Sequence, residues 1–185
     1  MPKQFLFALL IIFTSWAYAQ NKPKSYQIDL IIFLHQKAVS QHQEQEWLPG
    51  VISSARQSIL LQKNGDAASP YSLLPVAASS LRTAYWAINR QPQYRVLFQG
   101  SWVQPDSNNK TVSLPVNLRD GWQVKGTFKI QHRHYYDLNT DLAFFPPDNQ
   151  QSSFVFSKRQ RLEANMLYYL DHPRVGMLLK IHPIT

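Results

Sequence analysis

The chain has 185 residues, a formal net charge of +8 and no cysteine, so no disulfide can stabilise its fold. Its length suffices for one domain of ordinary size that buries its own hydrophobic core. The excess of lysine and arginine favours an anionic partner, although the same charge can also serve solubility alone.

An export signal is predicted over residues 1–19. A lysine near the start precedes the apolar run 5–16, and Ala17-Tyr18-Ala19 has the small-x-small pattern of a signal peptidase site. The run is too short for a stable membrane span, and no cysteine follows it that could carry a lipid. We expect one periplasmic domain over residues 20–185, while retention of the signal as an anchor stays open. Export argues against nucleic acid as a partner.

The first predicted element of the fold is a strand from Tyr26 to Leu34. Its second half is apolar at every position, which indicates an internal strand covered on both faces. The pattern is weaker over residues 36–80, where a short helix is expected between Val51 and Leu61. Trp47 is expected to dock on the core, with an exposed sugar-stacking platform as the alternative.

A helix is predicted over residues 75–89, because its apolar positions recur at i, i+3, i+4 and i+7. These positions are Leu81, Ala84, Tyr85 and Ile88. A single apolar stripe means that one face of the helix packs on a sheet. A strand is predicted next, over residues 94–105, and then a polar surface turn over residues 106–110.

The longest alternation of apolar and polar residues runs from Val124 to Phe144. One straight strand of this length would reach roughly 70 Å, which is too long for a domain of this size. We therefore expect the segment to bend or break near Asn139-Thr140-Asp141. Pro146-Pro147 should end it.

The C-terminal segment predicts a strand, a tight reversal and a returning strand. Residues 154–170 alternate with a period of two and are expected to form one long half-buried strand. The structural turn consists of Asp171, His172, Pro173 and Gly176, with Asp171 capping its own turn. The returning strand covers residues 177–181, and pairing should stop at Pro183, which has no N–H to donate.

These elements together predict an α+β fold. With few long crossovers after the second strand, the sheet should be mainly antiparallel and twisted, with long bent strands. One amphipathic helix should pack on one of its faces.

Three segments carry a family resemblance, of which the first is the opening strand from Tyr26 to Leu34. The strand over 94–105 reads YRVLFQGSWVQP, and the C-terminal segment contains RL at 161–162, LYYLDHP at 167–173, Gly176 and KIHP at 180–183. They resemble the landmarks of the CsiV family of periplasmic peptidoglycan-binding proteins. The sequence departs from the family pattern at four positions, which are Gln99, Val103, Gln160 and Tyr168. The first two departures remove polar groups that could hold a ligand.

The resemblance implies a non-enzymatic peptidoglycan-binding protein of the periplasm that supports peptidoglycan synthesis and the maintenance of cell shape. It further implies two protein partners, a bifunctional penicillin-binding synthase and its outer-membrane lipoprotein activator. It implies no cofactor.

Cationic and aromatic side chains are the candidate ligand-binding groups. Arg159 and Arg161 share one face of their strand, and Arg133 could join them from a neighbouring strand to form a cluster of forked donors for carboxylates. The other candidates are His134, Tyr135, Tyr169 and Trp102, of which the three aromatic residues would offer flat faces to sugar rings. The alternative is an ordinary solvated face on which the arginines pair with Glu163 or Asp137.

Other functions are also open. His132 and His134 lie two apart on a predicted strand and could bind a metal with His172 and Asp171, as in a metal-assisted cell-wall hydrolase or amidase. The sequence contains no nucleophile elbow, Cys-His pair or HExxH motif, and Asp137 and Asp141 are weak candidates for glycosidase acids. A further alternative is an envelope adaptor that binds proteins through an open sheet edge.

Overall fold

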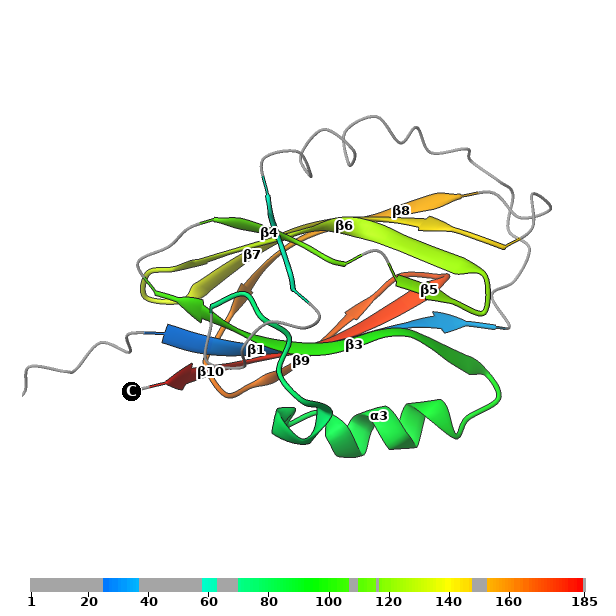
Figure 1. The fold of residues 1–185 in the computed structure, drawn as a ribbon, viewed down its shortest axis with the longest axis horizontal. Helices are drawn as coiled ribbons and strands as arrows, with labels where there is room; N and C mark the ends of the chain where they lie inside the picture. The colour runs from blue at the N-terminus through cyan, green and yellow to red at the C-terminus, as the bar shows by residue number, and fades with distance from the viewer. Residues whose placement is uncertain are drawn as a thin grey trace, which may run out of the picture.

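The computed structural model describes residues 25–36, 58–62, 70–106, 110–115, 117–147 and 153–184. In these ranges two β-sheets pack face to face, and one α-helix lies on the outer side of one sheet (Figure 1). None of the helices in these ranges has the length and apolarity that a membrane crossing requires. The elements are β1 (Ser25–His35), β2 (Ile59–Leu60), the 3-10 helix η1 (Val76–Ala78), α3 (Arg82–Asn89), β3 (Tyr94–Pro105), β4 (Thr111–Ser113), β5 (Asn117–Arg119), β6 (Trp122–His132), β7 (Tyr136–Phe145), β8 (Phe154–Leu162), β9 (Leu167–Asp171) and β10 (Val175–Ile184).

The fold class is α+β with mainly antiparallel strands, as predicted. The predicted export signal, Trp47 and residues 51–57 of the predicted short helix lie outside the described residues. The last part of that helix prediction is wrong, because Ile59 and Leu60 form β2. This short strand pairs in parallel with β4, and that pairing overrides a weak helical spacing.

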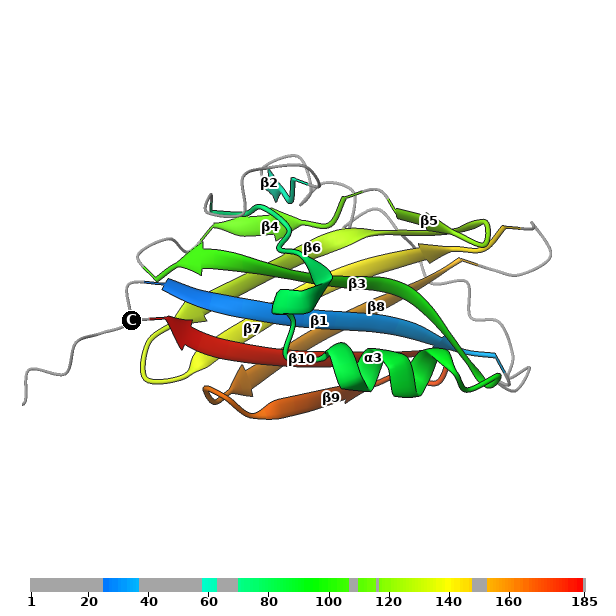
Figure 2. The ribbon, with the colours of Figure 1, turned by 60° about the horizontal axis from the view of Figure 1, so that its bottom comes forward.

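The four-stranded sheet has the order β3-β1-β10-β9, with every neighbouring pair antiparallel. β1 is internal, as predicted, and is apolar on both faces because each face is covered. Its residues Ile28, Leu30 and Ile32 enter the core between the sheets, whereas Ile31 and Phe33 face the helix. Figure 2 shows β1 between β3 and β10, with α3 in front of this sheet and running along its strands.

The six-stranded sheet has the order β2-β4-β6-β7-β8, with β5 also paired to β6. Its inward side chains meet those of the four-stranded sheet in one continuous core. Representative members from the two sheets are Leu30, Trp102, Phe128, Leu142, Phe156 and Leu179. Burial of such apolar surface is the main source of stability for a chain without disulfides.

The predicted helix over residues 75–89 is divided. η1 and α3 are separated at Ser79 and Ser80, where the chain is anchored to the sheet. The predicted apolar stripe is confirmed, because Leu81, Ala84, Tyr85 and Ile88 pack against Ile31, Phe33 and Val96 of the sheet.

The reversal between β6 and β7 lies earlier than predicted. The segment does not break near Asn139-Thr140-Asp141 but turns at Arg133-His134-Tyr135. His132 and Tyr136 pair opposite each other across this turn, so their side chains lie on the same face. The alternation therefore passes through the turn without a change of phase, and the pattern alone could not reveal it. β7 ends before Pro146, as predicted.

The predicted single strand over residues 154–170 is wrong. β8 belongs to the six-stranded sheet and β9 to the four-stranded sheet, and residues 163–166 carry the chain from one to the other. Asn165 has a positive φ of 64° in this connection, a conformation that asparagine adopts more readily than most residues. Leu162 and Leu170 both point into the core, so the period of two again continues across the change of sheet.

The predicted reversal between β9 and β10 is present. His172 and Val175 exchange two backbone hydrogen bonds, of 3.0 and 3.2 Å, around Pro173 and Arg174. β10 extends one residue beyond Pro183, which lies opposite Tyr26 of β1. The missing N–H is tolerated because β9 no longer borders β10 at this position.

Candidate functional site

Arg159 and Arg161 lie side by side on the outward face of β8. Among the residues that the structure describes, this strand pairs only with β7, so it forms an edge of the six-stranded sheet. The inward face of β8 is fixed by the buried side chains of Phe156 and Leu162, and the alternation of the strand then directs both arginines to the opposite face. Both arginine side chains are exposed.

Arg161 is held by an aromatic ring and a carboxylate. Its guanidinium carbon lies 5.1 Å from the centre of the Tyr135 ring. Its Nε lies 3.6 Å from Asp137 Oδ1, and the two side chains are 69% and 45% exposed. The expected alternative of cross-strand pairing is therefore realised for Arg161 with Asp137. An ion pair this exposed adds little stability, but it orients the guanidinium.

Arg159 lies in a row that contains no carboxylate. Its cross-strand neighbour on β7 is Asn139, and the neighbour of Asn139 on β6 is Lys129. In the described ranges no acidic side chain forms an ion pair with Arg159. We call Lys129, Tyr135, Asp137, Arg159 and Arg161 the arginine surface.

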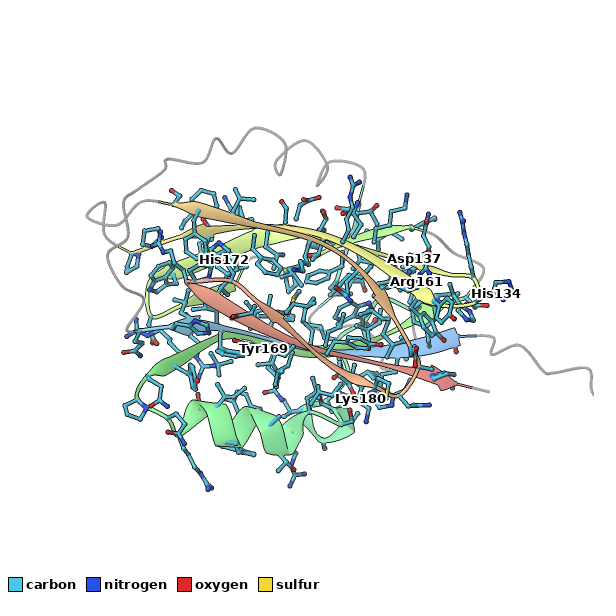
Figure 3. The ribbon with its side chains drawn as sticks, turned by 180° about the vertical axis from the view of Figure 1, so that it is seen from behind. His134, Asp137, Arg161, Tyr169, His172 and Lys180 are labelled. Carbon is cyan, nitrogen blue, oxygen red and sulfur yellow. The ribbon has the colours of Figure 1, made fainter. Side chains whose placement is uncertain are left out.

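The β6–β7 turn extends the arginine surface at its end. Arg133 and His134 are exposed in this turn, directly before Tyr135. The prediction that Arg133 lies on a strand next to β8 is wrong, because β6 ends at His132 and Arg133 belongs to the turn. Its backbone N–H donates to the carbonyl of Tyr135 within this turn, over 2.9 Å. Figure 3 shows His134, Asp137 and Arg161 together at one end of the two-sheet sandwich.

The prediction that Trp102 offers a face to sugars is wrong. Its side chain is 0% exposed and lies between the sheets, edge-on to Phe128 with 6.2 Å between ring centres. The predicted alternation of β3 is present, but the face that carries Trp102 is the inner one. Burial in the core explains its position and leaves no surface for a ligand.

Tyr169 lies on the outer face of the other sheet, away from the arginines. Its ring is nearly parallel to Phe33 of β1, with 6.3 Å between ring centres, and both rings approach Gly176 from either side. A Cβ atom on Gly176 would lie 2.5 Å from Phe33 Cζ, so only glycine fits beneath these rings. The Tyr169 hydroxyl donates to Asp171 Oδ1 over 2.7 Å.

Asp171 does not cap its own turn. Its carboxylate accepts the hydroxyl of Tyr169, whereas His172 caps the turn by accepting the N–H of Arg174 at Nδ1 over 3.2 Å. The His172 ring stacks on Phe154 of β8, with 5.5 Å between centres, and the Arg174 guanidinium lies 4.2 Å from the centre of the same Phe154 ring. The β9–β10 turn of one sheet therefore packs directly against β8 of the other sheet. Burial of the Arg174 guanidinium at this contact lowers its pKa.

The three histidines proposed as metal ligands do not meet. His132 Nδ1 lies 2.5 Å from Asp106 Oδ1, and its ring stacks on Tyr136. His134 is exposed in the turn, and His172 lies toward the other end of the sandwich (Figure 3). Within the described ranges no three His, Cys, Asp or Glu side chains form a group that could hold a metal ion.

Asp137 and Asp141 are not placed as glycosidase acids. They are four residues apart on β7, which corresponds to about 13 Å at the usual rise of a strand. Carboxylate pairs in glycosidases lie roughly 5 to 9.5 Å apart.

A polar triangle that the sequence analysis missed anchors the helix to the sheet. Asp29 Oδ2 lies 2.6 Å from Ser80 Oγ and 2.9 Å from His182 Nε2, and the same His182 nitrogen lies 2.8 Å from Ser80 Oγ. A hydrolytic triad needs the carboxylate and the hydroxyl on different ring nitrogens, so this arrangement does not relay a proton. The one signal in the sequence was an aspartate inside the apolar run of β1.

Asp29 is fully buried yet ionised. Burial alone would raise its pKa, but hydrogen bonds from Ser80 and Gln27 outweigh burial and hold the pKa below the ordinary value of 3.8. The Ser80 backbone N–H also donates to Asp29, over 3.0 Å. The negatively charged carboxylate of Asp29 therefore holds Ser80, and with it the segment before α3, against the sheet.

The fold and the arginine surface define a class: a two-sheet β protein with one packed helix, whose outer face carries two neighbouring guanidinium groups and a tyrosine ring. The chain belongs to the CsiV family, described as peptidoglycan-binding protein, and the match covers residues 5–184. The resemblance seen in the sequence is thereby confirmed over nearly the whole chain. Neither a curated protein nor a solved structure shows significant similarity to the chain.

Proposed function

We propose that this protein binds peptidoglycan through the arginine surface, without catalysing a reaction, and thereby supports peptidoglycan synthesis and cell shape. Family membership supports the ligand. One observation supports the arginine surface as the place where the ligand binds. Arg159 has no acidic partner among the described residues, and the neighbouring Arg161 is already oriented by Tyr135 and Asp137.

The chemistry of each group suits a different part of the ligand. A guanidinium presents parallel N–H donors that match a carboxylate, which the peptide stems of the wall carry. Tyr135 is 44% exposed and Arg161 lies over one face of its ring, so a sugar ring would stack on the opposite face. Arg133 and His134 would add donors from the adjoining turn.

The proposed setting is the periplasm, with residues 1–19 removed and residues 20–185 forming one domain. The proposed protein partners are those that the family resemblance implies, a bifunctional penicillin-binding synthase and its outer-membrane lipoprotein activator. No cofactor enters this proposal.

Neutralising the two arginines should weaken binding to the wall. We expect the double variant Arg159→Gln/Arg161→Gln to bind purified sacculi with an affinity at least about tenfold lower at moderate salt, because two charge-assisted contacts are lost. The measurement is the fraction of protein in the pellet as a function of sacculus concentration.

The matched control is Arg82→Gln/Arg90→Gln, which removes the same charge from exposed positions on and next to α3, on the outer side of the other sheet. This variant should bind like the unaltered protein. If both double variants bound sacculi as tightly as the unaltered protein, the arginine surface would not be the binding site. If both lost the same affinity, only the net charge of the protein would matter.

Export can be tested on protein recovered from cells. We expect the intact mass in the periplasmic fraction to correspond to a chain that begins at Gln20, because the Ala17-Tyr18-Ala19 site precedes it. A mass that includes residues 1–19, found with the membranes, would instead indicate a retained anchor.

A further inference from the structure

β9 is an open sheet edge with a free row of backbone groups. In the described part of the chain it pairs only with β10. His172 and Val175 exchange both backbone hydrogen bonds, and hydrogen-bonded pairs alternate along an antiparallel ladder. The N–H and C=O groups of Leu167, Tyr169 and Asp171 are therefore directed away from β10.

The side chains along this edge are apolar and exposed. Met166, Leu167 and Tyr169 are 55%, 52% and 52% exposed, three of the seven large hydrophobic residues that are exposed among those described. No charged residue interrupts the edge before Asp171. Native proteins usually blunt such an edge with lysine, proline or a covering segment.

Two other sheet edges among the described residues are protected. β3 is the opposite edge of the same sheet, and residues 71–74 cover part of it, with Tyr71 N–H donating to Val103 and Leu74 N–H to Ser101. The β8 edge carries Lys158, Arg159 and Arg161. Of these three edges, that of β9 is the one that neither charged side chains nor a covering segment protects in the part of the chain that the structure describes.

One cation of β8, Lys158, lies on the side of that strand that faces the β9 sheet. The two strands are joined by residues 163–166 and touch near both ends, where His172 stacks on Phe154 and the Tyr168 hydroxyl accepts the N–H of Glu163. Lys158 has the same parity as Phe156 and Leu162, so its exposed side chain lies on the side of β8 that faces the β9 sheet. A strand added to β9 would meet this positive charge.

We infer that the β9 edge binds an extended segment of a partner protein as an added strand, and that this segment alternates apolar residues with aspartate or glutamate. The backbone row supplies affinity, and the exposed leucine, methionine and tyrosine receive the apolar side chains. A second copy of this chain fits less well, because it would bring another protein of net positive charge, and a second Lys158, to the same edge.

This site is separate from the proposed wall-binding surface, since it uses the edge of the other sheet. The two proposals can therefore fail independently. Sedimentation with sacculi tests the arginine surface, and peptide binding tests the β9 edge.

The test uses a display library of random twelve-residue linear peptides and the full mature chain. We expect selected peptides to alternate apolar and acidic residues, and to bind the Leu167→Pro variant at least about tenfold more weakly, the factor equivalent to about 1.4 kcal/mol. Proline at the first position of an edge strand removes only an outward N–H, so the β9–β10 ladder should persist. Far-ultraviolet circular dichroism checks the fold.

A second pair of variants tests the same edge without proline. Leu167→Asp should weaken the same peptides by repulsion and by loss of apolar contact. Leu60→Asp, at an equally exposed leucine of β2, should not. Peptides without the acidic alternation, or unchanged binding to both Leu167 variants, would overturn the proposal. So would a dimer in sedimentation velocity that Leu167→Pro abolishes, because the occupant would then be a second copy.

Discussion

Replacing Trp102 by alanine should lower the free energy of unfolding by about 3–5 kcal/mol, the usual cost of removing a large buried aromatic side chain. Trp102 is one of the largest fully buried side chains and lies between the two sheets, edge-on to Phe128. The cavity left behind cannot collapse easily, because β3 is fixed by its register with β1 at Ile28. Equilibrium unfolding in urea measures the loss.

Trp102→Phe is the informative comparison. The indole Nε1 of Trp102 is buried and has no hydrogen-bond partner among the described residues. Phenylalanine removes this unsatisfied donor while keeping an aromatic ring against Phe128, so we expect less than half the loss seen with alanine. Equal losses in the two variants would show that the indole N–H is satisfied, or that the ring does not fill the core as described.

Replacing Asp29 by alanine should cost about 3 kcal/mol, because several donors lose their shared acceptor at once. Gln27 Nε2 donates to Asp29 over 2.8 Å, and the Ser80 backbone and hydroxyl donate to it as well. The loss should be local as well as global, since Ser80 precedes α3. Hydrogen exchange of the α3 amides should therefore accelerate more than exchange in β6 and β7.

The titration of Asp29 should make the free energy of unfolding depend on pH. Its pKa is lower in the folded protein than the ordinary 3.8, so its contribution is present above about pH 3.8 and is lost as pH falls through the folded value. Asp29→Asn has no such titration. Its unfolding free energy should therefore change less between pH 5 and pH 3, in thermal or urea unfolding, than that of the unaltered protein. A parallel pH dependence in both would contradict the ionised buried state.

Strands and their inward faces could be predicted from alternation, but the places where the chain changes direction could not. At residues 133–135 and 163–166 the connection has a length that preserves parity, so apolar positions continue at every second residue. Length alone showed that a break was needed after Val124. Its position depends on pairing between β6 and β7, which the spacing of one segment does not contain.

The candidate site could be predicted in part, for the same reason. The shared outward face of Arg159 and Arg161 follows from the buried residues on either side of them. Whether an aromatic residue faces solvent or the core depends on which side of the sheet is covered. The sequence does not contain this information, so the prediction of an exposed Trp102 is wrong. The triangle of Asp29, Ser80 and His182 joins three distant segments, so no local pattern could indicate it.

The position of β1 also sets the order in which the molecule can fold. Tyr26 pairs with Gln104 on one side and with Pro183 on the other, so the most apolar strand gains its first neighbour only when β3 has emerged and its second only when β10 has emerged. The β6–β7 hairpin needs only local contacts and can form first, whereas closure of the four-stranded sheet must overcome the entropy of a very long loop. We expect this run, YQIDLIIFL, to be the segment that a chaperone holds during the interval.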